Sequence, residues 1–86
     1  MPVICTFRGI KFYIYWDDHN PPHFHAVYGG QSMQVRIDNA EPIEGDLPPK
    51  QRKLVLAWAV LRREELLENW ELASQSEEPY PINPLI

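Results

Sequence analysis

Two adjacent glycines, Gly29 and Gly30, constrain the fold more than any other feature of the sequence. They separate two runs typical of strands, residues 23–28 and 31–37. Glycine readily adopts the positive φ that both central positions of a type I′ turn require. The sequence therefore predicts a β-hairpin with a two-residue turn at this point.

The register of this hairpin follows from counting outward from the turn. The predicted pairs are Tyr28 with Gln31, Ala26 with Met33, His25 with Gln34, Phe24 with Val35 and His23 with Arg36. Because side chains alternate along a strand, His23 and His25 are expected on one polar face, with a mainly apolar face behind them.

The rest of the predicted sheet region, residues 10–46, lies on both sides of the hairpin. Residues 10–16 alternate β-branched and aromatic side chains with others at period two, which predicts the first strand. Residues 17–22 contain two prolines together with Asp and Asn, which predicts a stiff loop. A short edge strand is expected around Pro42 and Ile43, since proline lacks the backbone N–H that a central strand needs.

One long helix is expected over residues 49–73, where good helix formers follow two prolines suited to a first turn. At about 1.5 Å per residue it would measure roughly 40 Å, so one end is expected to protrude or to form a homo-oligomer. Its apolar residues fall into two stripes, which indicates a second buried surface. The stripes are Leu54, Ala57, Trp58 and Leu61 on one side, and Leu56, Val60, Leu67 and Trp70 on the other.

The last segment, residues 74–86, contains three prolines and cannot continue the helix. It is expected to be an extended tail that lies against the body of the protein or against another chain. Sheet, helix and tail together predict an α+β fold, in which a small antiparallel sheet packs against one long helix.

Composition sets the outer limits of the fold and the function. With 86 residues and 44% hydrophobic content, residues 1–86 are expected to form a single globular domain. The formal net charge of −4 argues against general coating of nucleic acid and leaves only a local patch for RNA. Cys5 has no partner for an internal disulfide, and no secretion signal or membrane-spanning run is visible, so a cytoplasmic protein is expected.

The three histidines, His19, His23 and His25, all fall within seven residues, beside Asp17 and Asp18. Neutral imidazoles bind metal ions, so the three histidines with Asp17 form a candidate zinc or manganese site of a metal-dependent hydrolase. Alternatively, His23 and His25 hydrogen-bond to the acidic residues and to carbonyl groups, and thereby lock the loop onto the sheet.

A third interpretation is RNA chemistry without metal. Cleavage of a phosphodiester needs a base, an acid and a cation, which are roles that His23, His25 and Arg36 are able to fill. It requires both imidazoles to project together, near the guanidinium, where solvent reaches them. Tyr13, Tyr15 and Gln34 would then contact the substrate, with the tyrosine rings stacking on bases.

The chain resembles the bacterial domain-of-unknown-function family 4160. The resemblance covers about the whole chain and rests on three features: the string His-Asn-Pro-Pro-His-Phe-His of residues 19–25, the later pairs Glu44-Gly45 and Leu47-Pro48, and the helix sequences Leu-Val-Leu-Ala-Trp and Glu-Leu-Leu-Glu-Asn-Trp-Glu-Leu-Ala. It implies a toxin-like member of a two-gene toxin–antitoxin module, with a cognate small antitoxin-like protein as partner. The family's signature points to His19, His23 and His25 but assigns no reaction.

Three hypotheses therefore remain open. The leading one is a toxin-like protein that acts on RNA through the face of His23, His25 and Arg36. The second is the metal-dependent hydrolase. The third is a non-enzymatic interaction module, in which the helix and the tail of residues 79–86 bind a partner protein.

Overall fold

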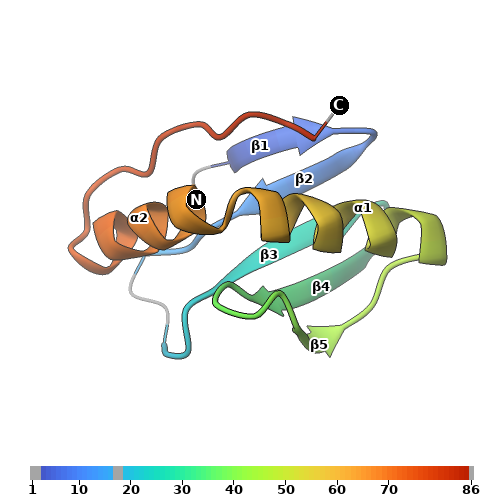
Figure 1. Cartoon of the computed structure of the whole chain (residues 1–86), viewed down its shortest axis with the longest axis horizontal. Helices are drawn as coiled ribbons and strands as arrows, with labels where there is room; N and C mark the ends of the chain where they lie inside the picture. The colour runs from blue at the N-terminus through green and yellow to red at the C-terminus, as the bar shows by residue number, and fades with distance from the viewer. Residues whose placement is uncertain (1–2, 17–18, 86) are drawn as a thin grey trace.

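The computed structural model describes residues 3–16 and 19–85, which form an α+β fold (Figure 1). Five antiparallel strands make one sheet in the order of the chain, and two helices lie against it. The elements are β1 (Val3–Phe7), β2 (Ile10–Tyr13), β3 (His23–Tyr28), β4 (Gln31–Arg36), β5 (Pro42–Gly45), α1 (Pro49–Leu61) and α2 (Arg63–Ser74). The α+β prediction is confirmed, whereas the single long helix is not.

The hairpin of β3 and β4 has the predicted register at every one of the five predicted pairs, including His23 with Arg36. The type of turn differs from the prediction. Gly29 has a φ of 59°, but Gly30 is not among the glycines with positive φ. Positive φ at only the first central position is typical of a type II′ turn, which preserves the same two-residue register.

The strand predicted over residues 10–16 is neither the first strand nor as long as expected. β2 ends at Tyr13, and β1 precedes it and pairs with it across a turn at Arg8 and Gly9. Both turn residues have positive φ, 52° and 78°. Arginine rarely occupies the first position of such a turn, because a Cβ crowds the backbone at positive φ, so the hairpin signal is weak in the sequence.

The helix predicted over residues 49–73 is interrupted at Arg62, whose φ and ψ are −105° and 21°. Each half buries its own residues: α1 buries Val55, Trp58 and Ala59, and α2 buries Leu66, Asn69, Trp70 and Ala73. The longest dimension of the molecule is 33 Å, so no 40 Å helix protrudes from it. Leu61 and Val60 were expected in the two buried stripes, one in each, and both are exposed.

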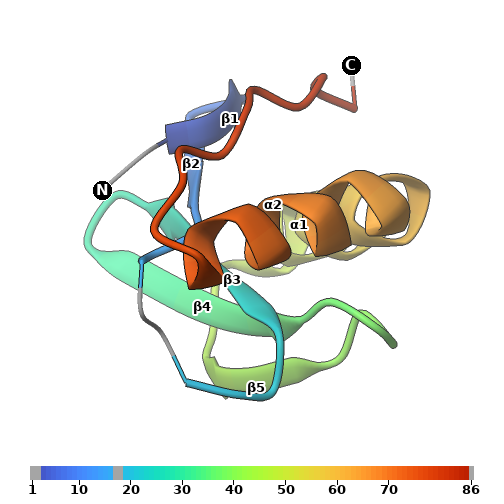
Figure 2. The ribbon, with the colours of Figure 1, turned by 90° about the vertical axis from the view of Figure 1, so that its left-hand side faces the viewer.

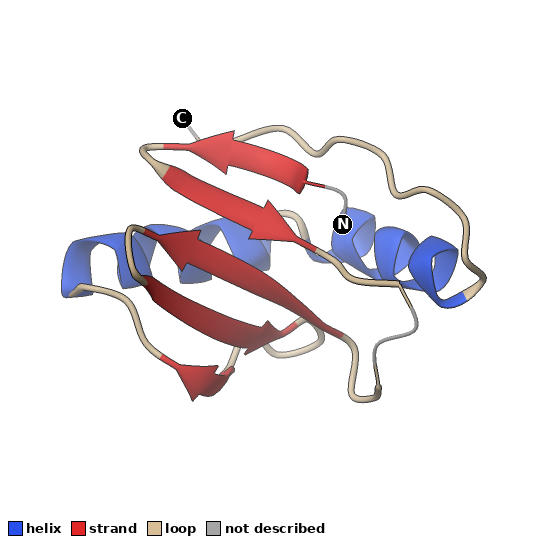
Figure 3. Ribbon diagram, turned by 180° about the vertical axis from the view of Figure 1, so that it is seen from behind, coloured by secondary structure: helices blue, strands red, loops and turns tan. Residues whose placement is uncertain are grey.

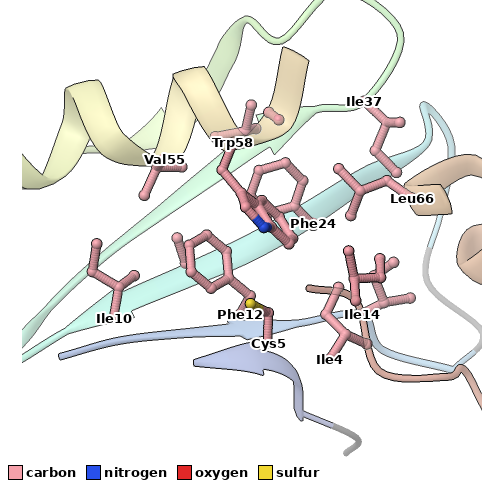
Figure 4. Packing of buried hydrophobic residues seen from close by; sticks show 14 of the residues in the cluster. Ile4, Cys5, Ile10, Phe12, Ile14, Phe24, Ile37, Val55, Trp58 and Leu66 are labelled. Carbon is pink, nitrogen blue, oxygen red and sulfur yellow. The ribbon is translucent and has the colours of Figure 1, made fainter. Parts of the chain in front are cut away.

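The core lies between the sheet and the helices. Trp58 of α1 contacts Phe12 of β2, with ring centroids 4.3 Å apart, and meets Phe24 of β3 edge-on at 5.5 Å (Figure 4). All three side chains are fully buried. Burying one large apolar side chain contributes about 1.5–3 kcal/mol, so this trio is a major link between α1 and the sheet.

The tail lies against the body of its own chain, which is one of the two expected arrangements (Figure 2). The backbone N–H of Ile82 donates a hydrogen bond to the carbonyl of Ile4 in β1, at 2.7 Å. The indole N–H of Trp58 donates to the carbonyl of Asn83, at 2.9 Å. Ile82 is buried. The tail thus closes the β1 side of the fold.

The edge strand expected around Pro42 and Ile43 is confirmed as β5, which pairs only with β4. All four of its residues are exposed. In the described part of the chain, no helix is both long enough and apolar enough to span a membrane.

Candidate functional site on the open face of the sheet

Both helices pack on one face of the sheet, and the opposite face is left open (Figure 3). Phe12, Phe24 and Met33 point to the helices and are buried. Because side chains alternate along a strand, the residues next to these three in sequence point to the open face. These neighbours are exposed or half-buried, apart from His23: Lys11 and Tyr13 of β2, Tyr15 beyond its end, His23, His25 and Val27 of β3, and Ser32, Gln34 and Arg36 of β4.

A row of aromatic rings follows this open face. Tyr13 and Tyr15 are nearly parallel, with ring centroids 6.1 Å apart and an interplanar angle of 12°. Tyr15 meets His25 edge-on at 4.2 Å, and His25 lies 5.1 Å from His23. We call these four residues the aromatic row. It combines three half-buried rings with a buried one at its end.

His23 is the buried end of the aromatic row, with 2% of its surface exposed. Its Nδ1 lies 2.7 Å from the carbonyl oxygen of Pro21 and donates a hydrogen bond to it. Trp70 of α2 packs 5.3 Å away on one side, and the His19 ring lies 5.7 Å away. The expectation that solvent reaches both imidazoles therefore fails at His23. The geometry favours the alternative in which this histidine locks the loop onto the sheet.

The polar residues expected beside the histidines are engaged with carboxylates. Arg36 is opposite His23 in the register, but its Nε is 2.6 Å from an Asp38 carboxylate oxygen. This hydrogen bond lowers the pKa of Asp38 and raises that of Arg36. Gln34 donates from its amide to a Glu44 oxygen at 3.1 Å. The guanidinium charge is thus balanced by a carboxylate, which weakens its expected role as a phosphoryl-binding cation.

The histidine cluster was also a candidate metal site. Among residues 3–16 and 19–85, no three His, Cys, Asp or Glu side chains are arranged to hold one ion. His19, His23 and His25 lie near one another, but His23 directs one ring nitrogen to Pro21. Asp17, the fourth predicted ligand, lies outside the described residues.

Sequence reasoning missed two residues that shape this site. Trp70 is expected only within an apolar stripe of the helix, and the structure places it against His23. The two lie 47 positions apart in the sequence, so no local pattern connects them. Asp38 carried a detectable signal: it follows Arg36 by two positions with opposite charge, and residues two apart along an extended chain share a face.

The fold and the site together define a class of protein: a small α+β domain whose single sheet exposes an aromatic face. The family described as Domain of unknown function (DUF4160) matches residues 9–71, most of the chain, and the protein belongs to that family. The matched segment contains the whole aromatic row together with α1 and most of α2. No curated protein and no solved structure matches the chain.

Proposed function

We propose that the protein is the toxin-like member of a two-gene toxin–antitoxin module and that it binds single-stranded RNA on the open face of its sheet. The observation that carries the proposal is the aromatic row, in which Tyr13, Tyr15 and His25 are half-buried and the Tyr15 ring lies beside each of the other two. Stacking of a base on an aromatic ring contributes about 1–3 kcal/mol and tolerates any base. The toxin-like role and the cognate small protein come from the family resemblance.

The rings are held in place before any RNA arrives. Tyr13 and His25 are paired across neighbouring strands, so a rigid backbone fixes their spacing. His23 braces the end of the row through Pro21 and Trp70. Pre-organised side chains lose little conformational entropy on binding, which favours affinity.

The geometry favours binding of RNA over cleavage by the histidines and Arg36. A general base must reach the proton that it removes, and His23 is buried. The charge that would stabilise the phosphoryl group is paired with Asp38. In this proposal the protein inhibits growth by occupying RNA, and its cognate partner relieves inhibition by covering the same face.

Binding of a short, fluorescently labelled single-stranded RNA, followed by anisotropy, tests the proposal. Tyr15→Ala removes the central ring and is expected to weaken binding about tenfold, whereas Tyr15→Phe keeps the ring and changes affinity less than about twofold. Val60→Ala, an exposed apolar truncation on α1, is the matched control and should leave affinity unchanged. Wild-type affinity in Tyr15→Ala would contradict RNA binding on this face.

Growth inhibition tests the biological half of the proposal. Expression of the wild-type protein is expected to slow growth. Co-expression of the cognate small antitoxin-like protein, encoded by the second gene of the module, is expected to restore growth. Tyr15→Ala should lose the inhibition while its circular dichroism spectrum and unfolding midpoint remain those of the wild type. A folded Tyr15→Ala variant that inhibits growth fully would refute the link between the aromatic row and toxicity.

A further inference from the structure

The tail begins with a turn that reverses the chain at the end of α2 and returns it toward β1 (Figure 1). In this turn the N–H of Ser76 donates to the carbonyl of Ala73, at 3.0 Å. The N–H of Glu77 donates to the carbonyl of Leu72, at 2.8 Å. The two bonds form a Schellman motif, in which one residue after the helix is left-handed. That residue is Ser76, with a φ of 59°.

Serine is an unfavourable residue at this position. Glycine usually occupies it, because a Cβ crowds the backbone at positive φ, and the penalty shifts a conformational equilibrium about tenfold. No glycine or proline lies between Ser74 and Pro79, so nothing in the local sequence stops α2 before Pro79. Local propensity over residues 75–77 therefore favours a chain that continues the helix over the turn that is observed.

Contacts between the tail and the body hold the turn closed against this preference. Asn69 of α2 donates to the Tyr80 carbonyl and accepts from its N–H. Ile82 is buried, and its N–H donates to the carbonyl of Ile4. None of these contacts involves residues 75–78. The body therefore provides the seat of the tail, and the turn only connects the tail to it.

We propose that two copies of the protein exchange their tails and form a domain-swapped dimer. In each copy, residues 75–77 would extend α2, and the tail would occupy the seat on the other copy. The tail makes the same contacts in the monomer and in the dimer, so the conformation of residues 75–77 decides the balance between the two. The proposal is independent of RNA binding on the aromatic row.

The hinge at residues 75–77 sets the expected dissociation constant of the dimer. A short flexible connection gives a tethered segment an effective concentration of about 1 mM, which would be the Kd if the hinge had no preference. Each of the two hinges that leaves the left-handed conformation tightens the dimer about tenfold, which predicts a Kd of about 10 µM. The protein is therefore expected to be mainly monomeric at about 1 µM and mainly dimeric at about 500 µM.

Sedimentation velocity over this range of concentrations measures the equilibrium. Ser76→Gly suits the positive φ of the turn and should raise Kd about a hundredfold, because both hinges lose their strain. Ser76→Ala improves the extended helix and should lower Kd about fivefold. Ser74→Ala is the matched control: position 74 ends α2 in the monomer and stays helical in the dimer, so Kd should change less than about twofold.

NMR on a mixed sample identifies the exchanged segment. Isotope-labelled and unlabelled protein are equilibrated together, and a filtered spectrum then detects only contacts between chains. Proximity of Ile82 to Ile4 should appear in this spectrum. A dimer without that contact forms through another surface and overturns the proposal. A wild type that stays monomeric at about 500 µM, or a Ser76→Gly variant that dimerises as tightly as the wild type, overturns it as well.

Discussion

At the scale of single residues, His23 shows how burial determines the chemistry of an imidazole. Its sequence neighbourhood fits a catalytic or metal-binding histidine, yet its ring lies against Trp70 and donates to the Pro21 carbonyl. His25, two residues later, remains half-buried within the open face. The same residue type on the same strand face therefore has a structural role at one position and a candidate binding role at the next.

This difference predicts unequal effects on stability. His23→Ala removes a buried ring and its hydrogen bond, and should lower the free energy of unfolding by about 2–3 kcal/mol. His25→Ala should cost about 1 kcal/mol or less, since its ring is half-buried. Urea unfolding monitored by circular dichroism measures both. Equal losses in the two variants would be inconsistent with His23 as the brace of the loop.

Tyr80 provides a residue-scale prediction in the alkaline range. Its hydroxyl donates to a Glu68 carboxylate oxygen at 2.5 Å, and this hydrogen bond, together with burial and the nearby charge, raises its pKa from 10.0 to about 12. In an absorbance titration, one tyrosine should ionise about two pH units late. Glu68→Gln removes the carboxylate and should return that tyrosine toward its ordinary pKa.

The sign of the stability effect follows from the direction of the Tyr80 shift. Folding raises the pKa, so the hydrogen bond stabilises the protein fully below pH 10 and loses its contribution as the pH rises through about 12. Tyr80→Phe cannot ionise and should lack this particular loss. If wild type and Tyr80→Phe destabilise in parallel across that range, the hydrogen bond to Glu68 does not link ionisation to folding.

At the scale of elements, one buried amide makes two of the hydrogen bonds between α2 and the tail. Asn69 is fully buried, donates from its amide nitrogen to the Tyr80 carbonyl at 2.8 Å and accepts from the Tyr80 N–H at 3.0 Å. A neighbouring strand would satisfy the same two backbone groups in the same way. The prolines around Tyr80 leave few backbone donors, so this side chain supplies two of the limited number of hydrogen bonds that hold the tail.

Truncation of this amide should therefore be costly. Asn69→Ala leaves a backbone donor and an acceptor of Tyr80 unpaired, and should lower the free energy of unfolding by about 2–3 kcal/mol. Hydrogen exchange at the Tyr80 amide should accelerate in the same variant. Asn83→Ala is the control, because only its backbone carbonyl accepts from Trp58, and it should change stability by less than about 0.5 kcal/mol. A neutral Asn69→Ala would show that the remaining contacts of the tail hold it in place without this amide.

Elements also show the limits of local sequence patterns. The edge position of β5 was predicted from Pro42 alone, because a missing N–H is a local property. The interruption of the helix at Arg62 was not predicted, because residues 60–64 contain no proline or glycine that would signal it. Here the packing of two separate helix faces on one sheet overrides strong helix propensity.

At the scale of the whole molecule, the net charge of −4 limits how the protein binds RNA. Among the described residues of the open face, Lys11 is exposed, and Arg36 is paired with Asp38. Most of the affinity must then come from stacking on the aromatic row, with only a few phosphate contacts.

This balance predicts a shallow dependence on salt. With at most about two phosphate contacts, from Lys11 and Arg36, the slope of log affinity against log salt concentration should be no steeper than about −1.4 for single-stranded RNA. Anisotropy titrations at several potassium chloride concentrations measure the slope. A slope steeper than about −4 would require more cations than the open face provides and would place the binding site elsewhere.

The sequence by itself determined the α+β class, the hairpin register and the face that His25 shares with Gln34, because turn geometry and side-chain alternation depend only on near neighbours. The hairpin of β1 and β2 was not predicted, because its turn places Arg8, rather than a glycine or asparagine, at positive φ. Only the tertiary structure decided that Trp70 buries His23 and that the tail pairs with β1. These contacts join residues far apart along the chain, and packing selects them only when the whole core forms.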